Sequence, residues 1–207
     1  ATAPAGARIG YDPWLHTTGW AANAAHVLAA AGMELVATPA NPLDAVWQDR
    51  PGPSPAPAVP YDEALAGRSS ADKRAALAEE LKARGLDAAI ISALDSVAWL
   101  LNIRGADVDH TPVALSYLIA HADGTAQLFI APEKTSPELL RHLGNAVTVR
   151  DRMEFEGALA DLAGQRVLVD PGFGVAAITH ALEAAGATPV AERDPTVLAK
   201  AIKHPAE

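Results

Sequence analysis

The sequence predicts an α/β fold in which helices flank both faces of a mixed β-sheet. Short apolar runs typical of strands alternate with longer helical segments along most of the chain. The runs 113–121 and 126–131 enclose an Asp-Gly step, which is typical of a β-hairpin and hence of an antiparallel pair. The alternation elsewhere favours parallel pairs, so the sheet is expected to contain both kinds.

A proline-rich run divides the chain into a short first part and a longer second part. Residues 51–60 read PGPSPAPAVP, and five of these ten residues are proline. Proline lacks an N–H and restricts the residue before it, so we expect neither a helix nor a central strand here. A stiff, extended spacer is the expected state.

The first part is expected to form a strand, a helix, a second strand and a short second helix. The strands are placed at 7–11 and 34–38. Thr17 or Thr18 is suited to cap a helix that runs to about residue 31 and ends at Gly32. Asn41 is suited to cap the short helix at 42–47. This piece is small for an independent domain, and we interpret it as the end of a larger one.

The second part is expected to contain most of the sheet. Serine, proline and glycine residues at the helix ends supply the usual start and stop signals. Strands are expected at 88–92, 113–121, 126–131, 147–150 and 166–169. Helices are expected at 71–84, 94–101, 136–143, 155–162, 175–185 and 195–203. No internal repeat is evident in the sequence.

Composition excludes several classes of function. The chain has 207 residues and a formal net charge of −9, with no long basic run, so nucleic acid is an unlikely partner. It has no cysteine, which excludes disulfides and thiolate chemistry and suits a cytoplasmic protein. No apolar stretch reaches the roughly 18 residues that a membrane span requires, so no membrane association is expected.

The most suggestive polar cluster is the loop from Arg104 to His110. Asp107, Asp109 and His110 are metal-ligating residue types, but their spacing supplies only half a site. We therefore expect no metal site and no catalytic residue in this chain. Arg104, Asp107 and His110 are instead candidates for contact with substrate or a neighbouring domain; simple stabilisation of the loop is the alternative.

Other motifs have plainer interpretations. The segment 168–174 reads LVDPGFG, a strand followed by a glycine-rich turn. It lacks the third glycine of a dinucleotide-binding loop and the Lys-Ser/Thr pair of a phosphate loop. A tight strand-to-helix turn is the expected structure. His26, His142 and His180 each lie alone on a predicted helix, and surface or packing roles are expected for them.

Several segments, in order along the chain, resemble those of Xaa-Pro aminopeptidases (aminopeptidase P). The longest is 93–108, ALDSVAWLLNIRGADV, which resembles the family pattern ALDxxAWLxNxRGxDV. Thr111 and His204 stand where other residues are usual, which leaves fine specificity open. Further similar segments are 9–15, 41–51, 66–73, 110–117 and 198–207.

The resemblance implies a creatinase/prolidase-like N-terminal fold and a parent enzyme that removes the residue preceding proline from peptides. It implies two divalent metals, manganese or zinc, held by two Asp, one His and two Glu in a catalytic domain beyond Glu207. It also implies peptide substrates with proline at the second position and a homodimer. The chain itself is then expected to be inactive, and to shape and gate the active site.

The same resemblance suggests domain boundaries. Residues 1–50 would be the C-terminal part of a first creatinase-like domain, 51–66 a linker, 67–203 a second creatinase-like domain, and 204–207 the start of the catalytic domain. Two alternatives stay open at this point: a stand-alone creatinase-N-like binding module, and a fragment of a related prolidase or creatinase.

Overall fold

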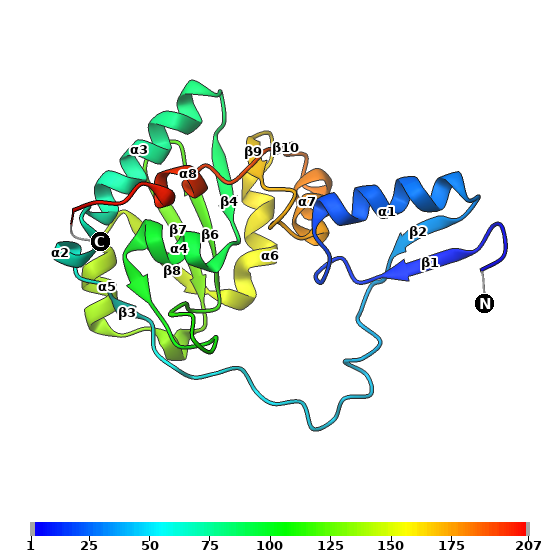
Figure 1. The fold of residues 1–207 in the computed structure, drawn as a ribbon, viewed down its shortest axis with the longest axis horizontal. Helices are drawn as coiled ribbons and strands as arrows, with labels where there is room; N and C mark the ends of the chain where they lie inside the picture. Colours follow the sequence, from blue (N-terminus) through cyan, green and yellow to red (C-terminus); the bar gives the residue numbers. More distant parts are fainter. Residues whose placement is uncertain (1–2, 206–207) are drawn as a thin grey trace.

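The computed structural model describes residues 3–205, and a six-stranded mixed sheet forms its centre (Figure 1). The strand order is β10-β9-β4-β6-β7-β8. The β6–β7 hairpin and the β4–β6 pair are antiparallel, whereas β4–β9, β9–β10 and β7–β8 are parallel. The predicted mixed sheet is therefore confirmed. The six strands are β4 (Ala88–Ile91), β6 (Ser116–His121), β7 (Ala126–Ile130), β8 (Val147–Asp151), β9 (Arg166–Val169) and β10 (Thr188–Ala191).

Helices cover both faces of this sheet, as predicted. Alternate residues of each strand point to opposite faces, so Ala89 and Ile91 enter one core, and Ala88 and Ile90 enter the other. The first core is closed by α3 (Ser70–Ala83), α4 (Leu94–Leu101) and α5 (Pro137–Leu143). The second is closed by α6 (Phe155–Ala158), the 3-10 turn η3 (Leu159–Leu162) and α7 (Ala176–Ala184).

The remaining elements are short. They are α2 (Glu63–Ala66), α8 (Thr196–Ala201), the two-residue strands β3 (Val59–Pro60) and β5 (Ile103–Arg104), and the 3-10 turns η1 (Pro132–Lys134) and η2 (Arg152–Glu154). Strands β3 and β5 pair antiparallel with each other, apart from the main sheet. None of the helices described between residues 3 and 205 combines the length and apolar character that a bilayer crossing needs.

The first part of the chain forms a separate unit beside α7. It consists of β1 (Arg8–Tyr11), α1 (Thr18–Ala30) and β2 (Glu34–Ala37), and its two strands pair parallel. Thr17 caps α1, as expected, by accepting a hydrogen bond from the Trp20 amide. The proline-rich arm then bows away from the molecule and returns to the sheet domain at β3 (Figure 1).

This first unit repeats the strand–helix–strand unit β9–α7–β10, although no repeat was evident from the sequence. Residues 8–13 read RIGYDP and residues 166–171 read RVLVDP, and in both units a helix connects two strands that pair parallel. The two copies meet through reciprocal main-chain hydrogen bonds at corresponding positions. These are Thr18 N to Gly174 O, Ala176 N to His16 O, Gly19 N to Pro171 O and Ala177 N to Pro13 O, at 2.8–3.0 Å. Because each unit donates and accepts at the same positions, the two units are related by a local two-fold axis near the Thr17–Val175 bridge.

The helix predicted at 42–47 is wrong: these residues form turns. Asn41 does accept a hydrogen bond from the Leu43 amide, as a cap would. However, Leu43, Val46 and Trp47 are all exposed, so no packed surface supports a helix of this length. The short elements α2, β3 and β5 were not predicted, and other details differ. Ser69 rather than Ser70 caps α3, residues 113–115 lie outside β6, and β10 was not predicted.

Candidate functional site

The loop 105–115 joins β5 to β6 and folds tightly against itself. The Gly105 amide donates to the Pro112 carbonyl at 3.2 Å, and Val108 bridges to Thr111. A Cβ at Gly105 would lie 2.7 Å from Ala114, so only glycine permits this close approach. The tight course fixes where each of the three candidate side chains lies.

Asp107 is buried and paired with Lys134. Its Oδ1 lies 2.5 Å from Lys134 Nζ, both side chains are almost fully buried, and its Oδ2 accepts from the Leu115 amide at 2.7 Å. Burial alone would raise the pKa of Asp107, but the hydrogen bonds from Lys134 and Leu115 outweigh it and hold the pKa below its usual value. Lys134 also donates to the Ser54 and Ala56 carbonyls. Asp107 therefore ties the loop to the proline-rich arm, which is the loop-stabilising role left open as the alternative; its partner Lys134 was not predicted.

Arg104 lies at the mouth of a pocket and is held in place by its neighbours. Its guanidinium carbon lies 3.8 Å from the centre of the Tyr61 ring, a stacking arrangement. One guanidinium nitrogen donates to the Ile103 carbonyl at 2.9 Å and approaches the Ala98 carbonyl at 3.4 Å. Among the described residues, none forms an ion pair with Arg104 within 4.0 Å. Its side chain is thus fixed while part of its donor set remains available.

His110 lies on the exposed outer turn of the loop, with a backbone φ of 60°. Asp109 beside it is exposed as well. The structure therefore separates the three candidates: Arg104 lines a pocket, Asp107 is buried, and His110 faces outward. Within residues 3–205, no group of three or more His, Cys, Asp or Glu side chains is arranged to hold a metal ion.

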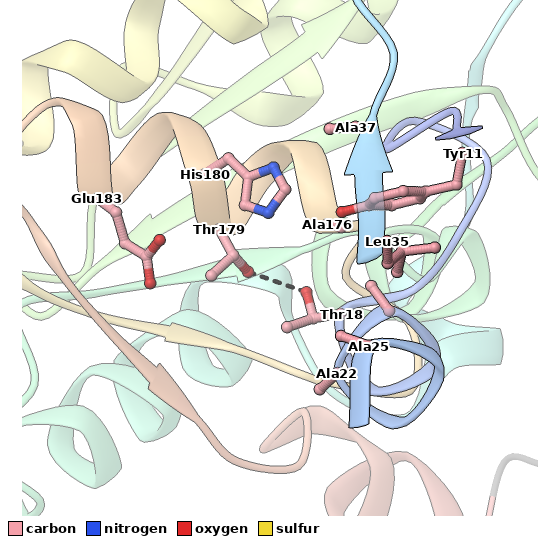
Figure 2. A pocket seen from close by; sticks show the side chains of 11 residues that line it. Tyr11, Thr18, Ala22, Ala25, Leu35, Ala37, Ala176, Thr179, His180 and Glu183 are labelled. Atoms are coloured by element: carbon pink, nitrogen blue, oxygen red, sulfur yellow. Dashed lines mark hydrogen bonds between the residues drawn. The ribbon is translucent and has the colours of Figure 1, made fainter. Parts of the chain in front are cut away.

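A second hollow of about 360 Å³ lies between α1, α7 and the β1–β2 pair (Figure 2). Thr179, His180 and Glu183 of α7 line one side, and Tyr11 lies opposite them. Thr18 and Thr179 join the two helices by a hydroxyl–hydroxyl hydrogen bond of 2.9 Å. Burial raises the pKa of Tyr11, so its phenol stays neutral at ordinary pH. This hollow belongs to the seam between the two repeated units.

The glycine-rich segment after β9 is a strand-to-helix turn, as expected. Asp170 accepts from the Gly172 amide with one carboxylate oxygen and from the Asp194 amide with the other, at 2.7 Å each. A Cβ at Gly174 would lie 2.4 Å from Val169, which explains the glycine by close packing. The turn's own carboxylate therefore occupies amides that a phosphate would need.

Comparison with known proteins decides the family. Residues 49–207 match the family model described as the Creatinase/Prolidase N-terminal domain. The chain belongs to this family. It is 37% identical over 171 residues to Aminopeptidase P2 of Arabidopsis thaliana, covering 80% of this chain and 24% of that protein. It is 33% identical over 208 residues to a probable Xaa-Pro aminopeptidase P of Arthroderma gypseum, covering 96% and 33%.

A solved structure agrees with this family assignment. The crystal structure of X-prolyl aminopeptidase from Caenorhabditis elegans, described as a cytosolic enzyme with a di-nuclear active site, superimposes with a TM-score of 0.89 and 29% identity. The match covers 99% of this chain and 34% of that one. This creatinase/prolidase N-terminal chain thus spans about a quarter to a third of the length of the relatives it matches.

Proposed function

We propose that this chain is the non-catalytic N-terminal region of a metal-dependent Xaa-Pro aminopeptidase. The observation that carries the proposal is the match to X-prolyl aminopeptidase over nearly all of this chain but only about a third of the other. A region of this size contributes shape and positioning rather than the full reaction. The expected substrates of the whole enzyme are peptides with proline at the second position.

The described residues of this chain offer no group of side chains that could bind the metals of such an enzyme. The Caenorhabditis elegans relative is described as di-nuclear, whereas the described residues of this chain hold no cluster of three or more ligand side chains. We infer that two divalent ions, manganese or zinc, are bound outside this chain. No step of the reaction is assigned to residues 3–205.

The role proposed for the loop differs among its residues. For Arg104 we propose pairing with a substrate carboxylate, which its stacking on Tyr61 and its remaining N–H donors support. His110, exposed at the loop's outer turn, is placed to contact a neighbouring domain. Asp107 would keep Arg104 and His110 in position, because its ion pair with Lys134 holds the loop between them.

The repeated unit supports the proposed division between a first part at 1–50 and a second domain at 67–203; the proposed linker, 51–66, contains β3 and α2. Trp20 of α1 occupies the position that Ile178 occupies in α7. Ile178 is fully buried beneath α6 and η3, whereas Trp20 is 45% exposed. Residues 8–37 therefore read as part of a second similar domain whose covering elements are not among the described residues. The proposed start of the catalytic domain, 204–207, lies partly outside those residues.

A cytoplasmic location and a homodimer complete the proposal. The Caenorhabditis elegans relative is described as cytosolic, and the chain has no cysteine. A homodimer is proposed from the family resemblance, with this region contributing to its interface. Sedimentation of the whole enzyme would check the dimer: the mass of one subunit at micromolar concentration would contradict it.

The direct test is to read the coding sequence past Glu207. We expect a continuing open frame that encodes two Asp, one His and two Glu in metal-ligand positions. The encoded full-length protein is then expected to release the first residue from an Xaa-Pro peptide in a metal-dependent way. A stop codon after Glu207 would instead favour a stand-alone binding module.

A further inference from the structure

The pocket beside Arg104 has a chemistry of its own. It encloses about 240 Å³ between α4, the loop 105–115 and the segment that follows α8. The apolar residues Trp99, Pro112 and Val113 line it, and so do the cationic residues Arg104, Lys200 and Lys203. An apolar wall beside a few charged groups is the usual composition of a small-molecule site.

The charge at this pocket is opposite to that of the chain as a whole. Three cationic side chains and a single carboxylate, Asp95, line it, whereas the chain carries a formal net charge of −9. Lys200 is neutralised by Asp95 and also donates to Ser96 Oγ at 3.2 Å. Arg104 and Lys203 thus supply a local positive charge that the pocket itself does not balance.

The two unbalanced cations differ in how firmly they are held. Arg104 is fixed by Tyr61 and by the Ile103 carbonyl, so little side-chain entropy is lost when it binds a ligand. Lys203 is exposed, and no acidic side chain within the described residues forms an ion pair with it. One preorganised guanidinium and one mobile ammonium facing an apolar wall suit a small anion attached to an apolar body.

We propose that this pocket binds the C-terminal carboxylate of a short peptide, with Arg104 and Lys203 as its charge partners. Trp99, Pro112 and Val113 contact the apolar side chain or proline ring that carries the carboxylate. The inference rests on the proposed function in taking a peptide as the ligand. It goes further in naming Lys203, the apolar wall and the end of the peptide that is bound.

A carboxylate suits the pocket better than a phosphate does. A phosphate site usually presents several backbone N–H groups from a helix start or a glycine-rich loop. Here the α4 N-terminus carries Asp95, and the neighbouring wall is apolar. A peptide carboxylate needs only one or two cationic donors and leaves its apolar body against Trp99.

The test is a binding titration of the chain with Ala-Pro-Ala, with the C-terminal amide of the same peptide, and with inorganic phosphate. The readout is the NMR shift of the Trp99 indole N–H, assigned with a Trp99→Phe variant. We expect the free acid to bind about tenfold more tightly than the amide, because only the acid offers a charged acceptor. Equal binding of acid and amide, or tighter binding of phosphate than of the acid, would overturn the proposal.

Variants locate the binding to the pocket. Arg104→Gln and Lys203→Gln are each expected to weaken binding of the free acid about threefold to tenfold and to leave the amide unchanged. Arg8→Gln removes one positive charge from the distant β1 strand, and we expect it to change neither. Lys203 is exposed, so Lys203→Gln keeps the test valid if Arg104→Gln fails to fold. Unchanged binding in both pocket variants contradicts the proposal.

The outcome is separable from that of the proposed function. If the chain binds the free acid no more tightly than the amide, the carboxylate site is contradicted even if the full-length enzyme cleaves Xaa-Pro peptides. Conversely, equal affinity for Ala-Pro-Ala and Ala-Ala-Ala would support the carboxylate site. It would also indicate that this region does not select peptides by proline.

Discussion

At the scale of single residues, the buried Lys134–Asp107 pair holds the candidate loop in place. The two side chains are 2% and 0% exposed, and Lys134 also reaches the main chain of the arm at Ser54. A charge buried in this way depends on its partner, because removal from water is costly unless the charge is paired. This ion pair therefore connects the loop 105–115, the proline-rich arm and η1.

We predict that Asp107→Asn lowers the free energy of unfolding by about 3–5 kcal/mol, because it leaves the Lys134 ammonium buried without its counter-charge. Urea unfolding measures the effect. Glu79→Gln, which breaks the exposed pair with Lys82, is the matched control and is expected to cost less than about 1 kcal/mol. A loss for Asp107→Asn no larger than that control would contradict the role of the pair.

His121 makes the free energy of unfolding depend on pH. Burial lowers its pKa, and the nearby Asp123 only partly opposes this effect. The folded chain therefore holds His121 neutral at pH values where the unfolded chain takes up a proton. We predict that the free energy of unfolding falls as pH drops below about 6.5, the ordinary histidine value. His121→Gln should flatten that slope, while His26→Gln, on an exposed position of α1, should leave it unchanged.

At the scale of elements, the ends of helices and strands could be predicted where the signal is local. Thr17 caps α1, and the Asp-Gly hairpin forms, because each depends on a few neighbouring residues. β10 was missed because it contains Pro189; its place at the edge of the sheet explains why proline is tolerated there. The helix at 42–47 had a valid cap but no surface to pack on.

The partners of the candidate residues could not be predicted in this way. Asp107 and Lys134 lie 27 residues apart, one on each side of the β6–β7 hairpin, so their contact depends on tertiary structure and not on neighbouring residues. The placement of Arg104 over Tyr61 likewise depends on pairing between β3 and β5. The repeat was hidden because the shared RxxxDP pattern is short and α1 is longer than α7.

The contact between the two repeated units, where α1 meets α7, can be tested by substitution. A Cβ at Gly19 would lie 2.9 Å from the Pro171 carbonyl oxygen, to which the Gly19 amide donates. We predict that Gly19→Val separates α1 from α7 and speeds hydrogen exchange at Thr18 and Ala176 at least about tenfold. Gly157→Ala, where a Cβ meets no neighbour, is the control. Unchanged protection in Gly19→Val would contradict the docked seam.

At the scale of the whole molecule, the chain combines one complete sheet domain with a second, smaller copy of part of it. The proline-rich arm links them, and Lys134 holds that arm at Ser54 and Ala56 beside the loop that follows Arg104. Family membership was recognisable from the sequence because long segments such as 93–108 keep their order.

We propose that this chain belongs to an Xaa-Pro aminopeptidase and does not itself catalyse the reaction. The most direct test incubates the purified chain with Mn²⁺ or Zn²⁺ and an Xaa-Pro peptide, and measures both bound metal and the released first residue. We predict no stoichiometric metal binding and no release above the rate without protein. Release of the first residue that a chelator abolishes would contradict the account.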